Sequence, residues 1–130
     1  MSESEKITIN LGAVDLGKID LLVEQGFYSN RTDFIRQSIR QQILVHSTEI
    51  KQLTTDKYTV IGVAKFDRHE LEGFRDGKRM VDIRLIGTLI IAEDVPLELV
   101  EETIQSVKVF GIIKARPDIK NFLQLLRDQS

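Results

Sequence analysis

The sequence contains no cysteine, and only two histidines occur among its 130 residues. The absence of cysteine excludes disulfides, thiolate nucleophiles and cysteine-ligated metal sites. His46 and His69 lie 23 residues apart, so no histidine cluster exists. A lone histidine is more often a surface residue or a helix-end partner than a metal ligand. We therefore expect neither a metal ion nor a cofactor.

The chain also lacks a long apolar run and a strong charge of either sign. No stretch of about 18 apolar residues occurs, and the N-terminal segment MSESEKITIN has no apolar signal core. This predicts a soluble, cytoplasmic protein without a membrane partner. The 18 basic and 20 acidic residues give a net charge of −2, so any case for nucleic-acid binding has to be local.

Motifs of the common enzyme classes are missing as well. The chain has no GxSxG elbow, no Walker loop and no GxGxxG turn, and no spaced acidic pair accompanies a nucleophile. We therefore expect a protein that is not an enzyme. One glycine-containing basic segment, EGFRDGKR at residues 72–79, is either a phosphate-binding loop or a turn between structural units.

A short alternating segment, KITINL, opens the part of the chain that carries structural signals. Alternation of apolar and polar residues is typical of a strand with one buried face. The apolar face holds Ile7, Ile9 and Leu11, and the polar face holds Lys6, Thr8 and Asn10.

Two amphipathic helices are predicted next. The first is indicated by the apolar spacing in VDLGKIDLLVEQG, with Asp15 as its N-cap and Gly26 as its stop. The second begins after Ser29 as N-cap and runs to about His46. Residues 47–56, STEIKQLTTD, are predicted to form the end of this second helix and a linker.

Three glycines mark an internal repeat in the remainder of the chain. Gly62, Gly87 and Gly111 are 25 and 24 residues apart, and each lies in an apolar run that precedes an acidic turn. A helix-like segment follows each run, and two of these segments begin with Pro96 and Pro117, where a first-turn proline belongs. The pattern predicts one strand and one helix per unit, with parallel strands. The helix-like segments span residues 68–79, 96–106 and 117–129.

These patterns indicate an α+β fold with two domains. Residues 1–50 form a dimerisation domain, residues 51–57 a linker, and residues 58–130 a small solenoid-like domain of three βα repeats. The central strand near Gly87 has the longest apolar run and is expected to be fully buried. An array of this kind has an open strand at each end, which favours an oligomerisation or partner-binding role for residues 58–130.

The first domain is too small to be stable by itself. About 45 residues bury little apolar surface, and a lone strand leaves both of its edges without hydrogen-bond partners. A homodimer solves both problems if residues 6–11 pair antiparallel with the same residues of a second copy. The resulting two-stranded ribbon presents Lys6, Thr8 and Asn10 twice, in a shape that fits the major groove of DNA.

The N-terminal part of the chain resembles the ribbon-helix-helix family of bacterial regulators, which includes CopG-type repressors and many antitoxins. The resemblance rests on KITINL, on the following GFYSNRTDFIRQSIRQQI and on the apolar stripe of the second helix. The resemblance covers residues 5–46. It implies that Lys6, Thr8 and Asn10 contact DNA bases. It also implies that the start of the second helix, with Ser29, Asn30 and Arg31, holds a DNA phosphate, which suits the N–H groups of a helix N-terminus.

The leading hypothesis is a sequence-specific DNA-binding transcriptional regulator that acts as a homodimer or a higher homo-oligomer. Two alternatives stay open: an antitoxin that shares the N-terminal domain, and a scaffold protein that uses this domain only to dimerise. Residues 1–50 hold five basic and seven acidic residues, which supports the scaffold. Arg31 is either a phosphate ligand or an ion-pair partner of Asp20 or Asp33.

Overall fold

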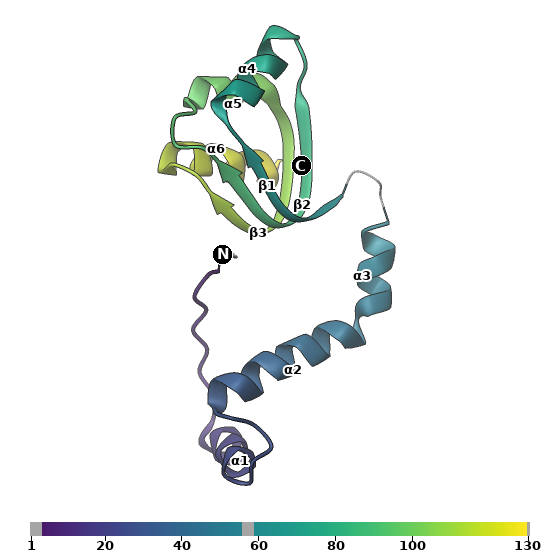
Figure 1. Ribbon diagram of the computed structural model, residues 1–130, viewed down its shortest axis with the longest axis vertical. Coiled ribbons are helices and arrows are strands. Elements are labelled where there is room, and N and C mark those ends of the chain that lie inside the picture. Colours follow the sequence, from purple (N-terminus) through teal and green to yellow (C-terminus); the bar gives the residue numbers. More distant parts are fainter. Residues whose placement is uncertain (1–3, 56–58, 130) are drawn as a thin grey trace. The chain divides into compact units, whose positions relative to one another are not determined.

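The computed structural model of the protein describes residues 4–55 and 59–129, and Figure 1 shows its helices and strands. The described residues fall into two compact units, one of residues 6–55 and one that contains residues 59–129. The first unit is helical and the second holds a sheet, so the mixed α and β content expected from the sequence is confirmed. Residues 56 and 57 of the expected linker, and residues 1–3, 58 and 130 of the expected domains, lie outside the described residues.

The first unit begins with an extended segment and continues with α1 (Ala13–Glu24) and α2 (Arg31–Val45). These are the two helices that the apolar spacing predicts. The expected N-cap of α1 is wrong, because the helix already begins after Gly12 and Asp15 lies in its first turn. An acidic side chain in the first turn still interacts favourably with the partial positive charge of a helix N-terminus.

A third helix, α3 (Ser47–Leu53), follows α2 directly. The expectation that residues 47–56 end the second helix and form a linker is therefore wrong for most of that range. His46 has φ −99° and ψ 18°, outside the helical region, and this one residue separates α3 from α2.

Gly26 ends α1 as predicted. Its φ is +86°, a conformation that glycine adopts without the steric cost that a Cβ brings. The N–H of Gly26 donates to the carbonyl oxygen of Val23 at 3.1 Å, and the N–H of Phe27 donates to that of Leu22 at 3.0 Å. This pair of hydrogen bonds satisfies carbonyl groups that the helix end would otherwise leave without partners. The chain can thus turn sharply before α2.

The second unit alternates strands and helices along the chain, and its three strands are parallel in the order β1-β2-β3. The predicted parallel arrangement is therefore confirmed. The third helix-like segment begins with Pro117 at the first helical position, whereas Pro96 is the N-cap of its helix. The elements are β1 (Val60–Phe66), α4 (Arg68–Asp76), β2 (Val81–Ile91), α5 (Leu97–Thr103), β3 (Ile104–Lys114) and α6 (Pro117–Asp128).

Two of the expected helix-like segments are shorter than predicted. α4 ends at Asp76, so residues 77–79 form a turn, and residues 72–76 of the segment EGFRDGKR are helical. α5 ends at Thr103, and the next residue already begins β3, so the helix expected over residues 96–106 is wrong at its C-terminal end. The Thr103 hydroxyl donates to the carbonyl oxygen of Leu99 at 2.6 Å, which satisfies a buried polar group at that boundary.

The three glycines lie side by side across the sheet. Gly62 pairs with Gly87, and Gly87 pairs with Gly111, without a register shift between them. Their φ angles are +133°, +138° and +133°, so all three have the same unusual backbone conformation. L-residues rarely adopt such angles, which explains why glycine occupies this position in each strand.

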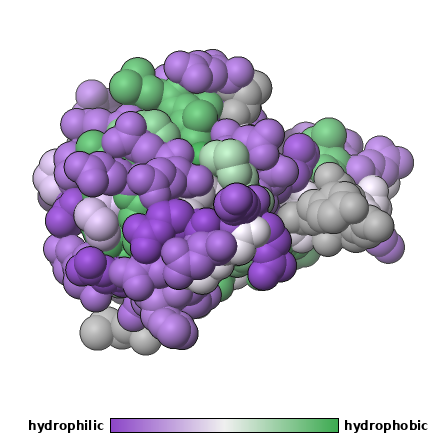
Figure 2. Space-filling view, turned by 90° about the horizontal axis from the view of Figure 1, so that it is seen from above, coloured by the Kyte–Doolittle hydropathy of each residue, from purple (hydrophilic) through white to green (hydrophobic). Residues whose placement is uncertain are grey.

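One hydrophobic core holds the second unit together. All three helices of this unit contribute to it, together with alternate residues of β2 and β3, so the helices cover one face of the sheet (Figure 1). Figure 2 shows that hydrophilic side chains cover most of the visible face of the molecule, with hydrophobic atoms exposed between them. Among the buried residues are Leu71 of α4, Leu85 and Leu89 of β2, Leu99 of α5, Val107 and Val109 of β3, and Ile119 and Leu123 of α6.

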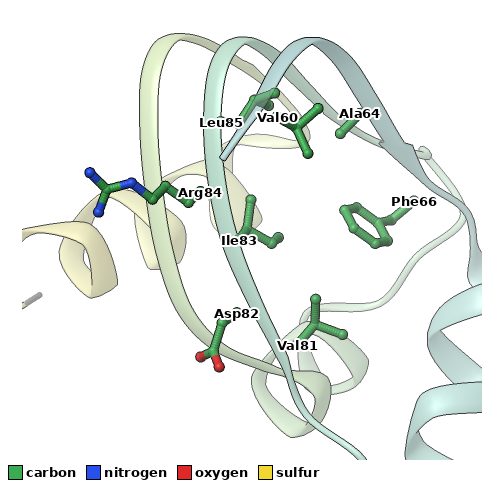
Figure 3. A pocket seen from close by; sticks show the side chains of 8 residues that line it. All are labelled: Val60, Ala64, Phe66, Val81, Asp82, Ile83, Arg84 and Leu85. Carbon is green, nitrogen blue, oxygen red and sulfur yellow. The ribbon is translucent and has the colours of Figure 1, made fainter. Parts of the chain in front are cut away.

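The opposite face of the sheet has no helix packed on it among the described residues. Asp82 and Arg84 of β2 are exposed there and point away from the apolar side chains of Val81 and Ile83 (Figure 3). The expectation of a fully buried central strand is therefore wrong for this face, because all helices of the unit pack on the other one.

Candidate nucleic-acid interface

Residues 6–12 form the extended segment that carries the predicted base contacts. The side chains of Lys6, Thr8 and Asn10 are all exposed. The alternate residues Ile7 and Ile9 are exposed as well, at 81% and 61% of their accessible area. The strand expected over residues 6–11 is not formed within the single chain, because these residues have no neighbouring strand to pair with.

An open apolar groove lies beside this segment within the same unit. Its volume is about 410 Å³, and residues of the extended segment, α1 and α2 line it. Of the residues of α1 and α2, Ile19 alone is buried in the single chain. The apolar stripes of both helices thus face a space that this unit does not fill. The lining includes Ile9, Leu11, Ile19, Leu22, Phe34, Ile35 and Ile39.

The start of α2 differs by one residue from the sequence prediction. Asn30, not Ser29, is the N-cap, and its side-chain oxygen accepts a hydrogen bond from the N–H of Asp33 at 2.8 Å. The Asp33 carboxylate in turn accepts a hydrogen bond from the backbone N–H of Ser29 at 2.9 Å. The N–H of Ser29 is therefore occupied, whereas those of Arg31 and Thr32 have no acceptor within the helix.

Asn30→Ala is expected to destabilise the first unit by about 1 kcal/mol, because the substitution removes the N-cap hydrogen bond of α2. Ser29→Ala should cost clearly less, since the Ser29 backbone N–H still reaches Asp33. Thermal unfolding followed by far-ultraviolet circular dichroism compares the two variants. Equal losses from both, or a larger loss from Ser29→Ala, would contradict the assignment of Asn30 as the cap.

Arg31 lies at the first position of α2 and forms a two-point ion pair with Asp20 of α1. Its Nε and one Nη atom each donate to a carboxylate oxygen at 2.8 Å. This side-chain hydrogen bonding is the main reason that the pKa of Asp20 lies below its ordinary value. Of the ion-pair partners that the sequence offers, Asp20 is therefore the one observed. A phosphate contact of the Arg31 side chain remains a prediction.

A polar hollow of about 320 Å³ surrounds the N-terminus of α2. Ser29 and Asn30, both predicted as phosphate contacts, line it together with Arg36 and Arg40. These two arginines were not among the expected site residues. They follow Thr32 at intervals of four residues, which places all three on one face of α2. That spacing is the sequence signal that could have identified the arginines.

Asp33 lines the same hollow and contributes the opposite charge. Hydrogen bonds from the Gln37 side chain, at 2.9 Å, and from the Ser29 N–H lower the pKa of Asp33, and the positive charge of Arg40 lowers it further. The carboxylate is therefore ionised at neutral pH. The two arginines of the hollow outnumber this single negative charge, so the hollow has a net positive set of side chains.

Other kinds of site have little support in the part of the chain that the structure describes. No group of three histidine, aspartate or glutamate side chains there could hold a metal ion. No helix among residues 4–55 and 59–129 is long and apolar enough to span a membrane. His46 lies 3.9 Å from the carboxylate of Glu49, in a position that suits a helix-end residue.

Comparison with known protein families matches residues 2–120 to the Ribbon-Helix-Helix transcriptional regulator family. The chain belongs to this family. The match extends across the three strands and ends near the start of α6, whereas the sequence resemblance covers residues 5–46 alone. Proteins of the ribbon-helix-helix family typically bind DNA and dimerise, and they are generally not enzymes. Neither a curated protein nor a solved structure matches the chain.

Proposed function

We propose that this family member is a sequence-specific transcriptional regulator that binds DNA as a homodimer. The observation that carries the proposal is that the apolar side chains of residues 6–11 are exposed and lie beside an open apolar groove. Pairing of the segment with that of a second copy would cover both. Burial of apolar surface stabilises association by roughly 25 cal/mol per Å².

In this dimer, Lys6, Thr8 and Asn10 lie on the face of the ribbon that is turned away from the helices. A two-stranded ribbon fits the major groove of DNA, where amine, hydroxyl and amide groups can bond to base edges. These residues are exposed in the single chain, as this role requires. We therefore retain all three as base contacts of the proposed regulator.

The start of α2 is the proposed phosphate contact. The N–H groups of Arg31 and Thr32 are available, and Ser29, Asn30, Arg36 and Arg40 line the adjoining hollow. A phosphate there would meet a helix N-terminus and two guanidinium groups. The Arg31 side chain contributes less, because it is held by Asp20.

The double substitution of Lys6 and Thr8 by alanine tests the base contacts. Each good base contact discriminates by about 1–3 kcal/mol, so affinity for a selected DNA site should fall by roughly a hundredfold or more. Fluorescence anisotropy at fixed salt measures the change, and Lys51→Ala removes a cation from α3 as a matched control. Wild-type affinity of the double variant for its selected site would refute the proposed ribbon contacts.

The scaffold alternative has one specific observation in its favour. Residues 1–50 carry more acidic than basic side chains, and Arg31 is neutralised by Asp20. A scaffold would show no salt-dependent DNA binding at low ionic strength, whereas the regulator would. The antitoxin alternative fits less well, because residues 59–129 form a folded unit with its own core instead of an extended tail.

We further propose that the sheet unit assembles dimers into higher oligomers. The two outer strands, β1 and β3, each pair with β2 alone among the described residues. An outer strand with an open edge offers backbone N–H and C=O groups to another chain.

A further inference from the structure

The three glycines of the sheet contact one another in a directional way. A Cβ atom on Gly87 would overlap the carbonyl oxygen of Gly62 and lie 2.9 Å from its carbonyl carbon. A Cβ atom on Gly111 would overlap the carbonyl oxygen of Gly87 in the same manner, 3.0 Å from its carbonyl carbon. The backbone at Gly87 and at Gly111 is therefore in close contact with the carbonyl group of the glycine in the preceding strand.

The outer glycines extend this pattern to both edges of the sheet. Gly62 has the same φ as Gly111, but the space where its Cβ would lie contains no atom within 4 Å. Gly62 of β1 thus has the same backbone conformation as Gly87 and Gly111, but no carbonyl group of a neighbouring strand contacts it. By the same repetition, the carbonyl of Gly111 points to the open edge of β3. The two edges are complementary to each other.

Apolar side chains are exposed at both edges. Ile61 and Val63 of β1 are exposed at 70% and 61%, and Phe110 of β3 is exposed at 51%. If Gly111 of one copy lay beside Gly62 of another, Phe110 would lie opposite Ile61 in the register that joins β2 to β3. Aromatic and β-branched side chains at directly opposite positions stabilise a pair of strands.

A hollow of about 100 Å³ also lies between β1 and β2. It is lined by Val60, Ala64 and Phe66 of β1 and by residues 81–85 of β2, which include the charged Asp82 and Arg84 (Figure 3). On β3, α6 packs over the corresponding half of the sheet. A copy added beyond β3 would place its own β1 next to the strand that α6 covers.

We propose that the sheet units of two copies join head to tail, with β3 of one copy pairing in parallel with β1 of the next and Gly111 beside Gly62. The new strand pair is continuous with the β1–β2 and β2–β3 interfaces and repeats their register. A second copy of this chain is the occupant, because it supplies the same glycine step and the same flanking apolar residues. The inference rests on the proposed role of this unit in assembly.

One hydrogen bond at the edge of β3 would change on assembly. Arg127 donates to the carbonyl oxygen of Val109 at 3.3 Å, and a backbone N–H of the incoming strand would replace that long hydrogen bond. Because the two surfaces differ, the contact forms a ring if its rotation closes and a filament otherwise.

Disulfide trapping in the full chain tests the register, since the chain has no cysteine of its own. Ile61→Cys and Phe110→Cys are prepared separately and mixed under mild oxidation. Residues directly opposite on neighbouring strands are close enough for a disulfide. We expect a cross-linked product in the mixture at more than tenfold the yield of either variant alone. A mixture of Ile61→Cys and Lys114→Cys, four residues out of register, is the matched control.

The mixture supports the proposal only if it cross-links above both single variants and above the control. Cross-linking of Ile61→Cys with itself would show a β1–β1 contact and overturn the head-to-tail arrangement. Equal yields in all samples, or no product, would also overturn it. DNA affinity of the reduced variants is measured separately. A negative cross-linking result therefore does not contradict the proposed DNA contacts, and a loss of DNA binding does not contradict the proposed sheet contact.

Gly62→Ala provides a second measurement on the same contact. Its Cβ meets nothing within the chain but would overlap the Gly111 carbonyl of the neighbouring copy. We expect association beyond the dimer to weaken by at least tenfold, measured by sedimentation in a dilution series without DNA. Gly73→Ala in α4, where a Cβ also meets nothing and φ is not positive, should leave association unchanged. Unchanged association of Gly62→Ala would overturn the proposed register.

Discussion

Gly87→Ala is expected to unfold the sheet unit. Two costs add at this position, since an alanine at φ +138° is strained and its Cβ overlaps the carbonyl group of Gly62. Backbone strain alone costs about 1–3 kcal/mol. The overlap forces β1 and β2 apart, so the total should exceed roughly 4 kcal/mol, a large share of the 5–15 kcal/mol that stabilises a typical domain.

Gly62→Ala is the matched comparison for this effect on stability. The two glycines share nearly the same φ, but a Cβ on Gly62 has no neighbour in the chain. We therefore expect Gly62→Ala to show the strain alone, about 1–3 kcal/mol. Hydrogen exchange of peptides from β2, followed by mass spectrometry on dilute protein, separates this unit from the helical one. Equal protection in both variants would show that the contact between glycines is unimportant.

The parallel sheet could be predicted from the sequence because its signal is regular. The glycines recur at nearly equal intervals within apolar runs, and the structure pairs them with one another. Glycines within strands predict close packing or a bulge, and the structure shows close packing. The atoms in contact could not be predicted, because the contact joins a Cα of one strand to a carbonyl 25 residues earlier. No local pattern in VIG, LIG or VFG reveals it. The boundary at Thr103 was missed because helix and strand adjoin there without a loop.

At the candidate site, the sequence predicted the helices well and their ends less well. Ser29 and Asn30 are both good cap residues, and the choice depends on the residue three positions later. Asp33 fits Asn30 as a cap and accepts the Ser29 N–H, whereas the corresponding residue for Ser29 is Thr32. The contributions of Arg36 and Arg40 were missed because they come from the helix body, a full turn or more beyond its start.

The alternating apolar residues of the segment 6–11 are not buried within a single chain. The pattern predicts that Ile7, Ile9 and Leu11 share a face, and Ile7 and Ile9 are more exposed than the core of a folded domain allows. Covering them requires a surface that the single chain does not supply. The sequence pattern and the exposure in one copy therefore both support the proposed homodimer, in which the N-terminal unit forms half of the interface.

Ile9→Lys is expected to abolish dimerisation and, with it, specific DNA binding. Ile9 lines the apolar groove, and in the proposed dimer its side chain is buried against the second copy. Burying a lysine there without a partner charge is costly. The dissociation constant of the dimer should rise at least a hundredfold, which corresponds to about 2.7 kcal/mol. Because Ile9 is largely exposed within one chain, the substitution acts mainly on the contact between chains.

Thr8→Lys is the matched control, one residue away on the face that the alternation predicts to be opposite. It introduces the same side chain on the ribbon face that is turned to solvent or DNA, so dimerisation should remain at the wild-type level. Analytical ultracentrifugation of dilute protein without DNA measures the dimer constant of both variants. If the two lysines weakened the dimer equally, alternation would not determine the interface. If neither did, pairing through residues 6–11 would be wrong, and the groove would need a different partner.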